Sequence, residues 1–154
     1  MKAIVTVGIP ASGKSTFAEN IISNDPNYIE LNRDNIRKEL FKIAGWTEYV
    51  FSEENERMVT TEQYDRIRAA SNSNKNIIIT DTNLKMKYIR SIVSLLEHFG
   101  YKVQLKICDI SFMEAVRRNH ARSVGMEPNR LKIQYDQFLE TKKRVESRYR
   151  NYLI

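Results

Sequence analysis

The segment Gly8–Thr16, GIPASGKST, contains a lysine and hydroxyl side chains after a glycine-containing loop, a set that can bind nucleotide phosphates. It matches the pattern G-x-x-x-x-G-K-[ST], follows the apolar stretch KAIVTVG and opens a helix-like stretch, as a phosphate-binding loop (P-loop) requires. Backbone N–H groups of such a loop and of the following helix N-terminus bind phosphate oxygens. The pattern predicts that the nucleotide contacts Gly8, Ala11, Ser12, Gly13, Lys14, Ser15 and Thr16.

Two of these side chains have specific predicted roles. Lys14 would reach the β- and γ-phosphate oxygens, and the hydroxyl of Ser15 would hold Mg²⁺. We therefore expect ATP and Mg²⁺ as cofactors. The alternative is a glycine-containing turn that fits the pattern by chance.

A carboxylate and a guanidinium stand three residues apart in LNRDNIR, where a short apolar stretch gives way to a helix-like one. Residues at i and i+3 share a helix face, so Asp34 and Arg37 can point into one pocket. Asp34 could take the proton of an attacking hydroxyl, and Arg37 could grip a phosphate on the acceptor. Such an acceptor carries both a hydroxyl and a phosphoester, as a polynucleotide end does. The alternative is a capped helix with a surface ion pair.

Asp81 ends the apolar stretch NIIITD, which has the form of a Walker-B element. A carboxylate in that position supports Mg²⁺ directly or through water. It could equally orient the acceptor or an arginine. The alternative is that Asp81 only caps the following helix, since DTNLK suits an N-cap turn.

Arg118 and Arg122 lie four residues apart in EAVRRNHARSVGMEP and are expected to share a helix face. Like charges at this spacing cost roughly 0.2–0.5 kcal/mol, a penalty that a bound anion would reverse. The arrangement resembles the lid of small P-loop kinases, whose arginines close over the transferred phosphate. The alternative is a solvated basic face.

Apolar, β-branched stretches alternate with helix-like stretches along the whole chain, which predicts an α/β fold with a parallel sheet. The expected strands are KAIVTVG, YIEL, NIIIT and KVQLKICD, and the last helix is expected to begin at Asn129 as its cap. Ligands bind at the carboxyl ends of such strands. Those ends carry Gly8, Asn32 to Asp34, Asp81 and Asp109.

The composition of the 154 residues predicts one domain, residues 1–154, with no membrane span. No signal peptide is visible, and the single cysteine, Cys108, fits a reducing cytoplasm. The net charge of +6 favours a polyanionic partner such as nucleic acid or nucleotides.

The motifs GIPASGKST, NRDNIR, TDTN and VRRNHAR occur in the order and spacing of the polynucleotide kinase family of bacteriophages, so the chain resembles its kinase domain from Met1 to about Tyr149. The resemblance implies a P-loop kinase-type parallel sheet of about four to five strands, helices on both faces and an arginine-bearing lid. It also implies transfer of the ATP γ-phosphate to 5′-hydroxyl ends of DNA or RNA in end repair, a cytoplasmic location (the host's, if phage-encoded) and self-association.

The family's roles carry over to matching residues. Lys14 and Ser15 resemble the catalytic P-loop pair, Asp34 the general base, Arg37 the contact to the acceptor's 3′-phosphate, Asp81 an active-site carboxylate, and Arg122 the lid arginine on the donor phosphates, with Arg118 beside it. Two departures stand out. Ala11 replaces the family's glycine, which is tolerable where φ is negative, and no D-x-D-G phosphatase motif is present, so we expect no 3′-phosphatase activity from this chain.

Two other functions remain open on the sequence: a P-loop kinase for a small metabolite, and an ATP-dependent switch module.

The role of the aromatic segment GWTEYVF is also open. Its aromatic residues, Trp46, Tyr49 and Phe51, could stack a nucleobase or form a hydrophobic cluster under a loop.

Overall fold

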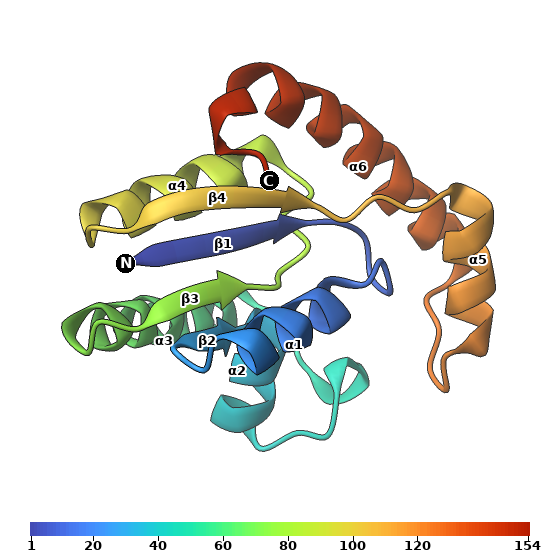
Figure 1. The fold of residues 1–154 in the computed structure, drawn as a ribbon. Coiled ribbons are helices and arrows are strands. Elements are labelled where there is room, and N and C mark those ends of the chain that lie inside the picture. Colours follow the sequence, from blue (N-terminus) through green and yellow to red (C-terminus); the bar gives the residue numbers. More distant parts are fainter.

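The computed structural model describes residues 1–154, which form one parallel sheet with helices around it (Figure 1). The sheet has the strand order β2-β3-β1-β4, and every neighbouring pair is parallel. The predicted α/β fold is therefore confirmed, with four strands. Their bounds are β1 Lys2–Val7, β2 Tyr28–Leu31, β3 Asn76–Ile79 and β4 Lys102–Ile107.

Six α-helices connect or follow the strands. Two short 3₁₀ turns accompany them, η1 at Trp46–Glu48 and η2 at Arg150–Tyr152. None of the helices combines the length and the apolar composition needed to cross a lipid bilayer. The helices are α1 Lys14–Asn24, α2 Arg33–Phe41, α3 Glu53–Asn72, α4 Met86–His98, α5 Phe112–Ala121 and α6 Pro128–Arg148.

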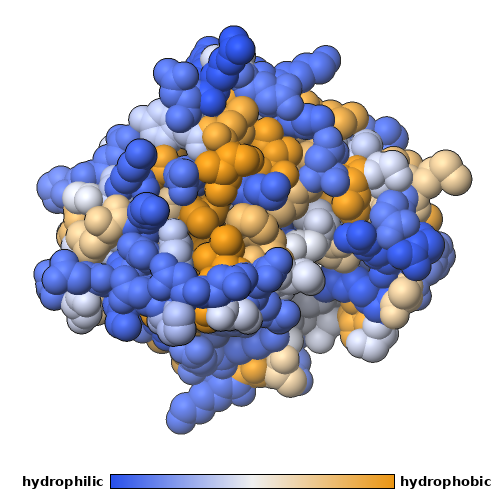
Figure 2. Space-filling view, in the orientation of Figure 1, coloured by the Kyte–Doolittle hydropathy of each residue, from blue (hydrophilic) through white to orange (hydrophobic).

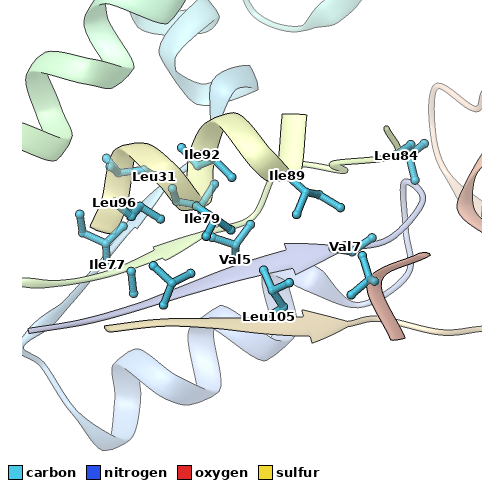
Figure 3. Close-up of a cluster of buried hydrophobic side chains, with 14 of the residues drawn as sticks. Val5, Val7, Leu31, Ile77, Ile79, Leu84, Ile89, Ile92, Leu96 and Leu105 are labelled. Atoms are coloured by element: carbon cyan, nitrogen blue, oxygen red, sulfur yellow. The ribbon is translucent and has the colours of Figure 1, made fainter. Parts of the chain in front are cut away.

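The sheet is buried on both faces because successive side chains of a strand point to opposite sides. In β1, Ile4 packs with Ala18 of α1, whereas Val5 and Val7 join a larger cluster that includes side chains of α3, α4 and α6. Figure 3 shows this larger cluster between the sheet and α4. Burial of one such side chain contributes roughly 1.5–3 kcal/mol, so the two clusters fix the sheet that positions the loops.

The surface on the α1 side is mainly hydrophilic, with hydrophobic side chains through its middle (Figure 2). At the outer edge of β4, Leu153 forms a parallel bridge with Leu105, and the N–H of Ile154 donates to the carbonyl of Leu105 at 3.1 Å. The last residues of the chain therefore occupy part of that strand edge.

The last helix begins differently from the sequence prediction. Its N-cap is Glu127, whose carboxylate accepts the N–H groups of Asn129 and Arg130 at 3.1 and 3.0 Å. Pro128 takes the first helical position, where its missing N–H is not needed. The prediction that Asn129 is the cap is wrong because Pro128 starts the helix earlier.

The order of the strands places a topological switch point between β1 and β3. The chain leaves β1 for the outer strand β2, returns to β3, and then crosses to β4 on the other side of β1. Ligands in open parallel sheets bind where the connections diverge in this way, outside the carboxyl ends of the strands. The segment Gly8–Thr16 and Asp81 lie at these two strand ends.

Candidate active site

Gly8 and Gly13 shape the loop that follows β1. A Cβ atom on Gly8 would lie 2.5 Å from Oγ of Ser12 and 3.0 Å from the carbonyl oxygen of Cys108, so only glycine fits there. Gly13 has a φ of 96°, in the left-handed region that glycine adopts without strain. These two residues let the backbone turn tightly from β1 into α1.

Ala11 is also left-handed, with a φ of 62°. The condition under which alanine is tolerable at this position, a negative φ, is therefore not met. A non-glycine residue in this conformation costs roughly 1–2 kcal/mol, because its Cβ lies too close to the following carbonyl oxygen. The turn geometry of the loop therefore overrides the preference of the residue that stands there.

The loop has several polar groups without a partner in the protein. The N–H groups of Gly13, Lys14, Ser15 and Thr16 donate to no backbone or side-chain acceptor, and Oγ of Ser12 is buried without a hydrogen bond. Free N–H groups at a helix N-terminus attract anions, and a buried unpaired hydroxyl is costly. The loop therefore offers donors that could bind the oxygens of a phosphate chain.

Lys14 is folded over this loop. Its ammonium group donates to the carbonyl oxygens of Ile9 at 2.6 Å and Gly8 at 3.1 Å. Burial lowers the pKa of Lys14 to about 8, and the nearby charges of Asp81 and Asp34 oppose that shift. Lys14 therefore retains a charge at neutral pH that a phosphate could bind.

Ser15 and Thr16 lie exposed at the start of α1, and neither hydroxyl has a partner in the protein. No group of three or more acidic, histidine or cysteine side chains could hold a metal ion by itself. Mg²⁺ usually keeps several waters and takes few protein oxygens beside substrate phosphates. The oxygen of Ser15 next to the phosphate loop fits that mode of binding.

Asp81 follows β3 and connects it to the start of α2. Its Oδ1 accepts the N–H of Arg33 at 2.8 Å, and its Oδ2 accepts Nε2 of Gln63 at 3.1 Å. Burial raises the pKa of Asp81, and these two hydrogen bonds oppose the shift. Asp81 does not cap α4, whose N-cap is Lys85, so that alternative is wrong.

Asp34 lies in the first turn of α2, directly after Arg33, whose N–H donates to Asp81. Its side chain is 66% exposed, and Oδ1 accepts Nη1 of Arg37 at 2.6 Å. The N-cap of this helix is Asn32, whose side chain accepts the N–H of Asn35. Asp34 is therefore not needed as a cap and keeps its second oxygen free for a ligand.

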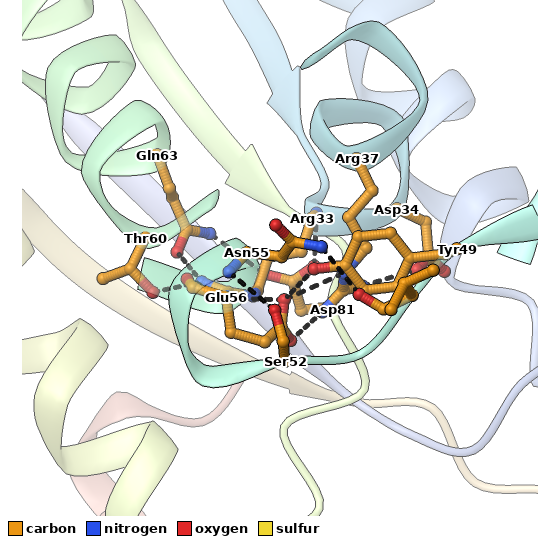
Figure 4. A network of polar contacts seen from close by, with 11 residues as sticks. Arg33, Asp34, Arg37, Tyr49, Ser52, Asn55, Glu56, Thr60, Gln63 and Asp81 are labelled. Carbon is orange, nitrogen blue, oxygen red and sulfur yellow. Dashed lines mark hydrogen bonds and ion pairs between the residues drawn. The ribbon is translucent and has the colours of Figure 1, made fainter. Parts of the chain in front are cut away.

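Arg37 is the centre of a polar network (Figure 4). Glu56 of α3 accepts from Nη2 and Nε of Arg37 at 2.6 and 3.3 Å, and Tyr49 donates to Glu56 at 2.9 Å. Burial alone would raise the pKa of Glu56, but the hydrogen bonds from Arg37 and Tyr49 lower it below the ordinary value. The side chain of Arg37 is only 14% exposed, so it is not a solvated surface charge.

Two aromatic rings also hold Arg37. Its guanidinium carbon lies 5.3 Å from the ring centre of Tyr49 and 5.4 Å from that of Phe51, and the two rings meet edge to face. Sequence reasoning left the roles of these aromatic residues open. Tyr49 and Phe51 pack around an arginine, whereas Trp46 makes no aromatic or cation–π contact.

The two lid arginines take different positions. Arg118 donates to the carbonyl of Ala11 at 2.8 Å and to Glu114 at 2.8 Å, which ties α5 to the phosphate loop. Helix α5 ends at Ala121, and Arg122 continues in extended backbone with an exposed side chain. The expectation that both arginines share a helix face is therefore wrong, since the helix stops before Arg122.

Arg122 faces Asp34 and Arg37 across a pocket of about 140 Å³. This pocket brings together α2, the η1 turn and the lid, and its lining also includes Lys38, Ile43, Gly45, Trp46 and Tyr49. A second cavity of about 310 Å³ shares Gly45, Trp46 and Arg122 with the first and extends to Thr47, Ser123 and Val124. The N–H of Gly8 donates to the carbonyl of Thr82, and the carboxylate of Asp81 accepts the N–H of Arg33, so the phosphate loop, the end of β3 and the start of α2 are neighbours.

Sequence reasoning missed Glu56 and Gln63 of α3, and it missed Asn32 as the cap of α2. The asparagine offered a signal, since Asn directly before a helical stretch is a favoured N-cap. The two α3 residues offered none, because their partners are 19 and 18 residues away along the chain.

The chain is similar to known proteins over nearly its whole length. Residues 4–147 match the model of a family described as an AAA domain. A protein of Autographa californica nuclear polyhedrosis virus, named "putative bifunctional polynucleotide kinase/RNA ligase", is 28% identical over 147 residues, which cover 89% of this chain and 21% of the viral protein.

Solved structures also superpose on most of this chain. A chain in the structure of the Pnkp1/Rnl/Hen1 RNA repair complex superposes with a TM-score of 0.79 and 26% identity, over 93% of this chain and 45% of that one. A gluconokinase from Sinorhizobium meliloti 1021 superposes with a TM-score of 0.58 and 19% identity, over 88% of this chain and 74% of that one. The present chain thus spans less than half of the two relatives named for polynucleotide kinase or RNA repair.

Proposed function

The chain belongs to the AAA-domain family whose model it matches, and from this premise we propose that it is an ATP-dependent 5′-hydroxyl polynucleotide kinase. The observation that carries the proposal is the shared site. The phosphate loop with its free N–H donors lies beside the end of β3, where Asp81 holds the N–H of Arg33 next to Asp34, and Arg122 lines the same pocket as Asp34. Such a site can hold a donor triphosphate and an acceptor hydroxyl at once, as phosphoryl transfer requires.

The donor side would be formed by the P-loop and the lid. The N–H groups from Gly13 to Thr16 and the ammonium of Lys14 would bind the β- and γ-phosphates of ATP. Mg²⁺, held by Ser15 and at most supported by Asp81, would neutralise charge on those oxygens. Arg118 already contacts the loop through the carbonyl of Ala11, and Arg122 would meet the transferred phosphoryl group from the lid.

The acceptor side would use Asp34 as general base. The 5′-hydroxyl oxygen attacks the γ-phosphorus, its proton passes to the carboxylate of Asp34, and the bond from phosphorus to the β–γ bridging oxygen breaks to leave ADP. Asp34 has one oxygen free for this proton, because only Oδ1 is bonded to Arg37. Asp81 would act one step away, by holding the N–H of Arg33 and with it the first turn of α2.

Arg37 would bind the phosphate that follows the first nucleoside. Glu56 already holds Nη2 and Nε, so Nη1, now bonded to Asp34, is the nitrogen that can turn to a phosphate. If Nη1 turned from Asp34 to the acceptor phosphate, Oδ1 of Asp34 would also become free. The site therefore favours an acceptor that brings a phosphate beside its hydroxyl.

The partner we propose is the end of a polynucleotide, with RNA as the first to test because the names of both relatives mention RNA. A net charge of +6 suits such a polyanion. A cytoplasmic location (the host's, for a viral protein) and self-association remain part of the proposal. Light scattering of the purified chain tests the latter.

An assay with γ-labelled ATP tests the function. We expect label on a 5′-hydroxyl oligonucleotide and none on the same oligonucleotide already phosphorylated at its 5′ end. Label on small hydroxyl metabolites alone would instead support a metabolite kinase, and release of free phosphate alone would support a switch module. Either of those results would overturn the proposal.

A further inference from the structure

Trp46 stands apart from the other aromatic residues near the site. Tyr49 is buried against Phe41, and Phe51 packs on Tyr49 and Arg37. The side chain of Trp46 is 44% exposed, and it makes no aromatic, cation–π or hydrogen-bond contact. A large ring that is left open beside a reactive pocket is available to a ligand.

The two cavities that Trp46 lines indicate which kind of ligand its ring could contact. It lines both cavities: the one that holds Asp34 and Arg37, and the adjoining one that extends to Val124. The adjoining cavity, about 310 Å³, is at the lower end of small-molecule pockets, which are roughly 300–1,000 Å³. Its lining residues are Gly45, Thr47, Arg122, Ser123 and Val124, and no carboxylate is among them.

We propose that Trp46 stacks on the nucleobase of the acceptor's first nucleotide, the one that carries the 5′-hydroxyl. This inference rests on the proposed function. With the hydroxyl at Asp34 and the following phosphate at Arg37, the sugar lies in the smaller cavity and its base extends toward Trp46. Aromatic side chains stack on bases of any identity. Trp46 would therefore favour acceptors that have a nucleobase, with no preference among the four bases.

The chain contains one tryptophan, so its fluorescence reports on this ring alone. Without ATP, a short single-stranded RNA with a 5′-hydroxyl should quench the emission. The same RNA with an abasic first nucleotide should quench it much less. Equal quenching by both RNAs would overturn the inference, as would quenching by ATP alone with no further change on adding RNA.

Kinetics give a second readout. Trp46→Leu keeps an apolar side chain but removes the ring, and should raise the acceptor KM about 5- to 140-fold, the equivalent of about 1–3 kcal/mol of lost stacking. The KM for ATP and kcat should stay the same, and Trp46→Phe should recover most of the loss. Tyr64→Leu is the matched control, since Tyr64 is a partly exposed ring in the middle of α3 that packs on Phe99.

The two proposals fail in different ways. If the wild-type chain phosphorylates RNA ends and Trp46→Leu has an unchanged acceptor KM, the stacking role is wrong and the kinase function stands. If the wild-type chain labels no polynucleotide, the proposed function itself fails, and the acceptor role of Trp46 fails with it.

Discussion

Glu56 holds Arg37 through both carboxylate oxygens, at 2.6 Å from Nη2 and 3.3 Å from Nε. This pair joins α3 to α2 and fixes two of the three guanidinium nitrogens. The third, Nη1, contacts Asp34. These contacts use three of the five N–H groups of the guanidinium, so the orientation in which Arg37 offers its remaining donors is set by a residue on another helix.

Glu56→Gln should weaken binding of the acceptor. The amide keeps the size of the side chain but loses its charge, and a hydrogen bond to a charged group contributes about 1.5–3 kcal/mol. We expect the acceptor KM to rise about tenfold or more with an unchanged KM for ATP. Glu53→Gln is the control, because Glu53 is exposed in the first turn of the same helix. A matching loss for ATP would contradict the positioning role.

The lowered pKa of Lys14 predicts a pH dependence of ATP binding. The free protein loses the ammonium charge as the pH rises through about 8, whereas bound phosphates favour the charged form. The ATP dissociation constant should therefore increase above pH 8, by about tenfold per pH unit at most.

Calorimetry in two buffers with different ionisation enthalpies checks this prediction. Near pH 8, ATP binding should take up protons, and Lys14→Met should bind ATP weakly with no proton uptake from this group. An ATP affinity that stays constant from pH 7 to pH 9.5 would show that Lys14 does not titrate in this range.

Arg122→Ala should lower kcat far more than it raises the KM for ATP. An arginine that stabilises the transferred phosphoryl group contributes roughly 10³–10⁵ in rate in related chemistry. Arg117→Ala is the control, because Arg117 is 70% exposed on α5 and pairs only with Glu114. Single-turnover measurements separate the two effects, and a change confined to the KM for ATP would make Arg122 a ground-state contact.

Ala11→Gly should stabilise the protein. Glycine removes the cost of a left-handed alanine, roughly 1–2 kcal/mol, and adds back about 0.5–1 kcal/mol of unfolded-state entropy. The net gain, with a midpoint of about 0.75 kcal/mol, should raise the melting temperature by about 1.5–3 °C. Ala44→Gly, at an exposed loop position without a positive φ, should lower it instead. A lower melting temperature for Ala11→Gly would show that the loop is not strained at Ala11.

Much of the fold could be predicted from the sequence because its signals are local. The β-branched stretch before Gly8 and the Gly-Lys-Ser after it define a strand, a loop and a helix within a few residues, and alternation of strands and helices implies the parallel sheet. The P-loop kinase fold is confirmed by both the strand order and the structural neighbours. The positive φ of Ala11 could not be predicted, since a residue type alone does not reveal a left-handed turn.

The surroundings of the site could not be predicted in the same way. Asp81 was identified from its place after an apolar strand, but its partners, the N–H of Arg33 and Gln63, follow from how α2 and α3 pack together. The three glutamates in the first turn of α3 are typical of a helix start, so Glu56 was indistinguishable from Glu53 and Glu54. The choice among them depends on which face of α3 meets α2, which is a tertiary property.

The pairing of Leu153 and Ile154 with Leu105 affects how the edge of the sheet can associate with other chains. An unpaired strand border offers N–H and C=O groups to any other chain that can adopt an extended shape. Here the chain's own final residues satisfy some of those groups on the outer side of β4. Leu153 and Ile154 would thus limit edge-to-edge pairing of β4 with an extended segment of another chain.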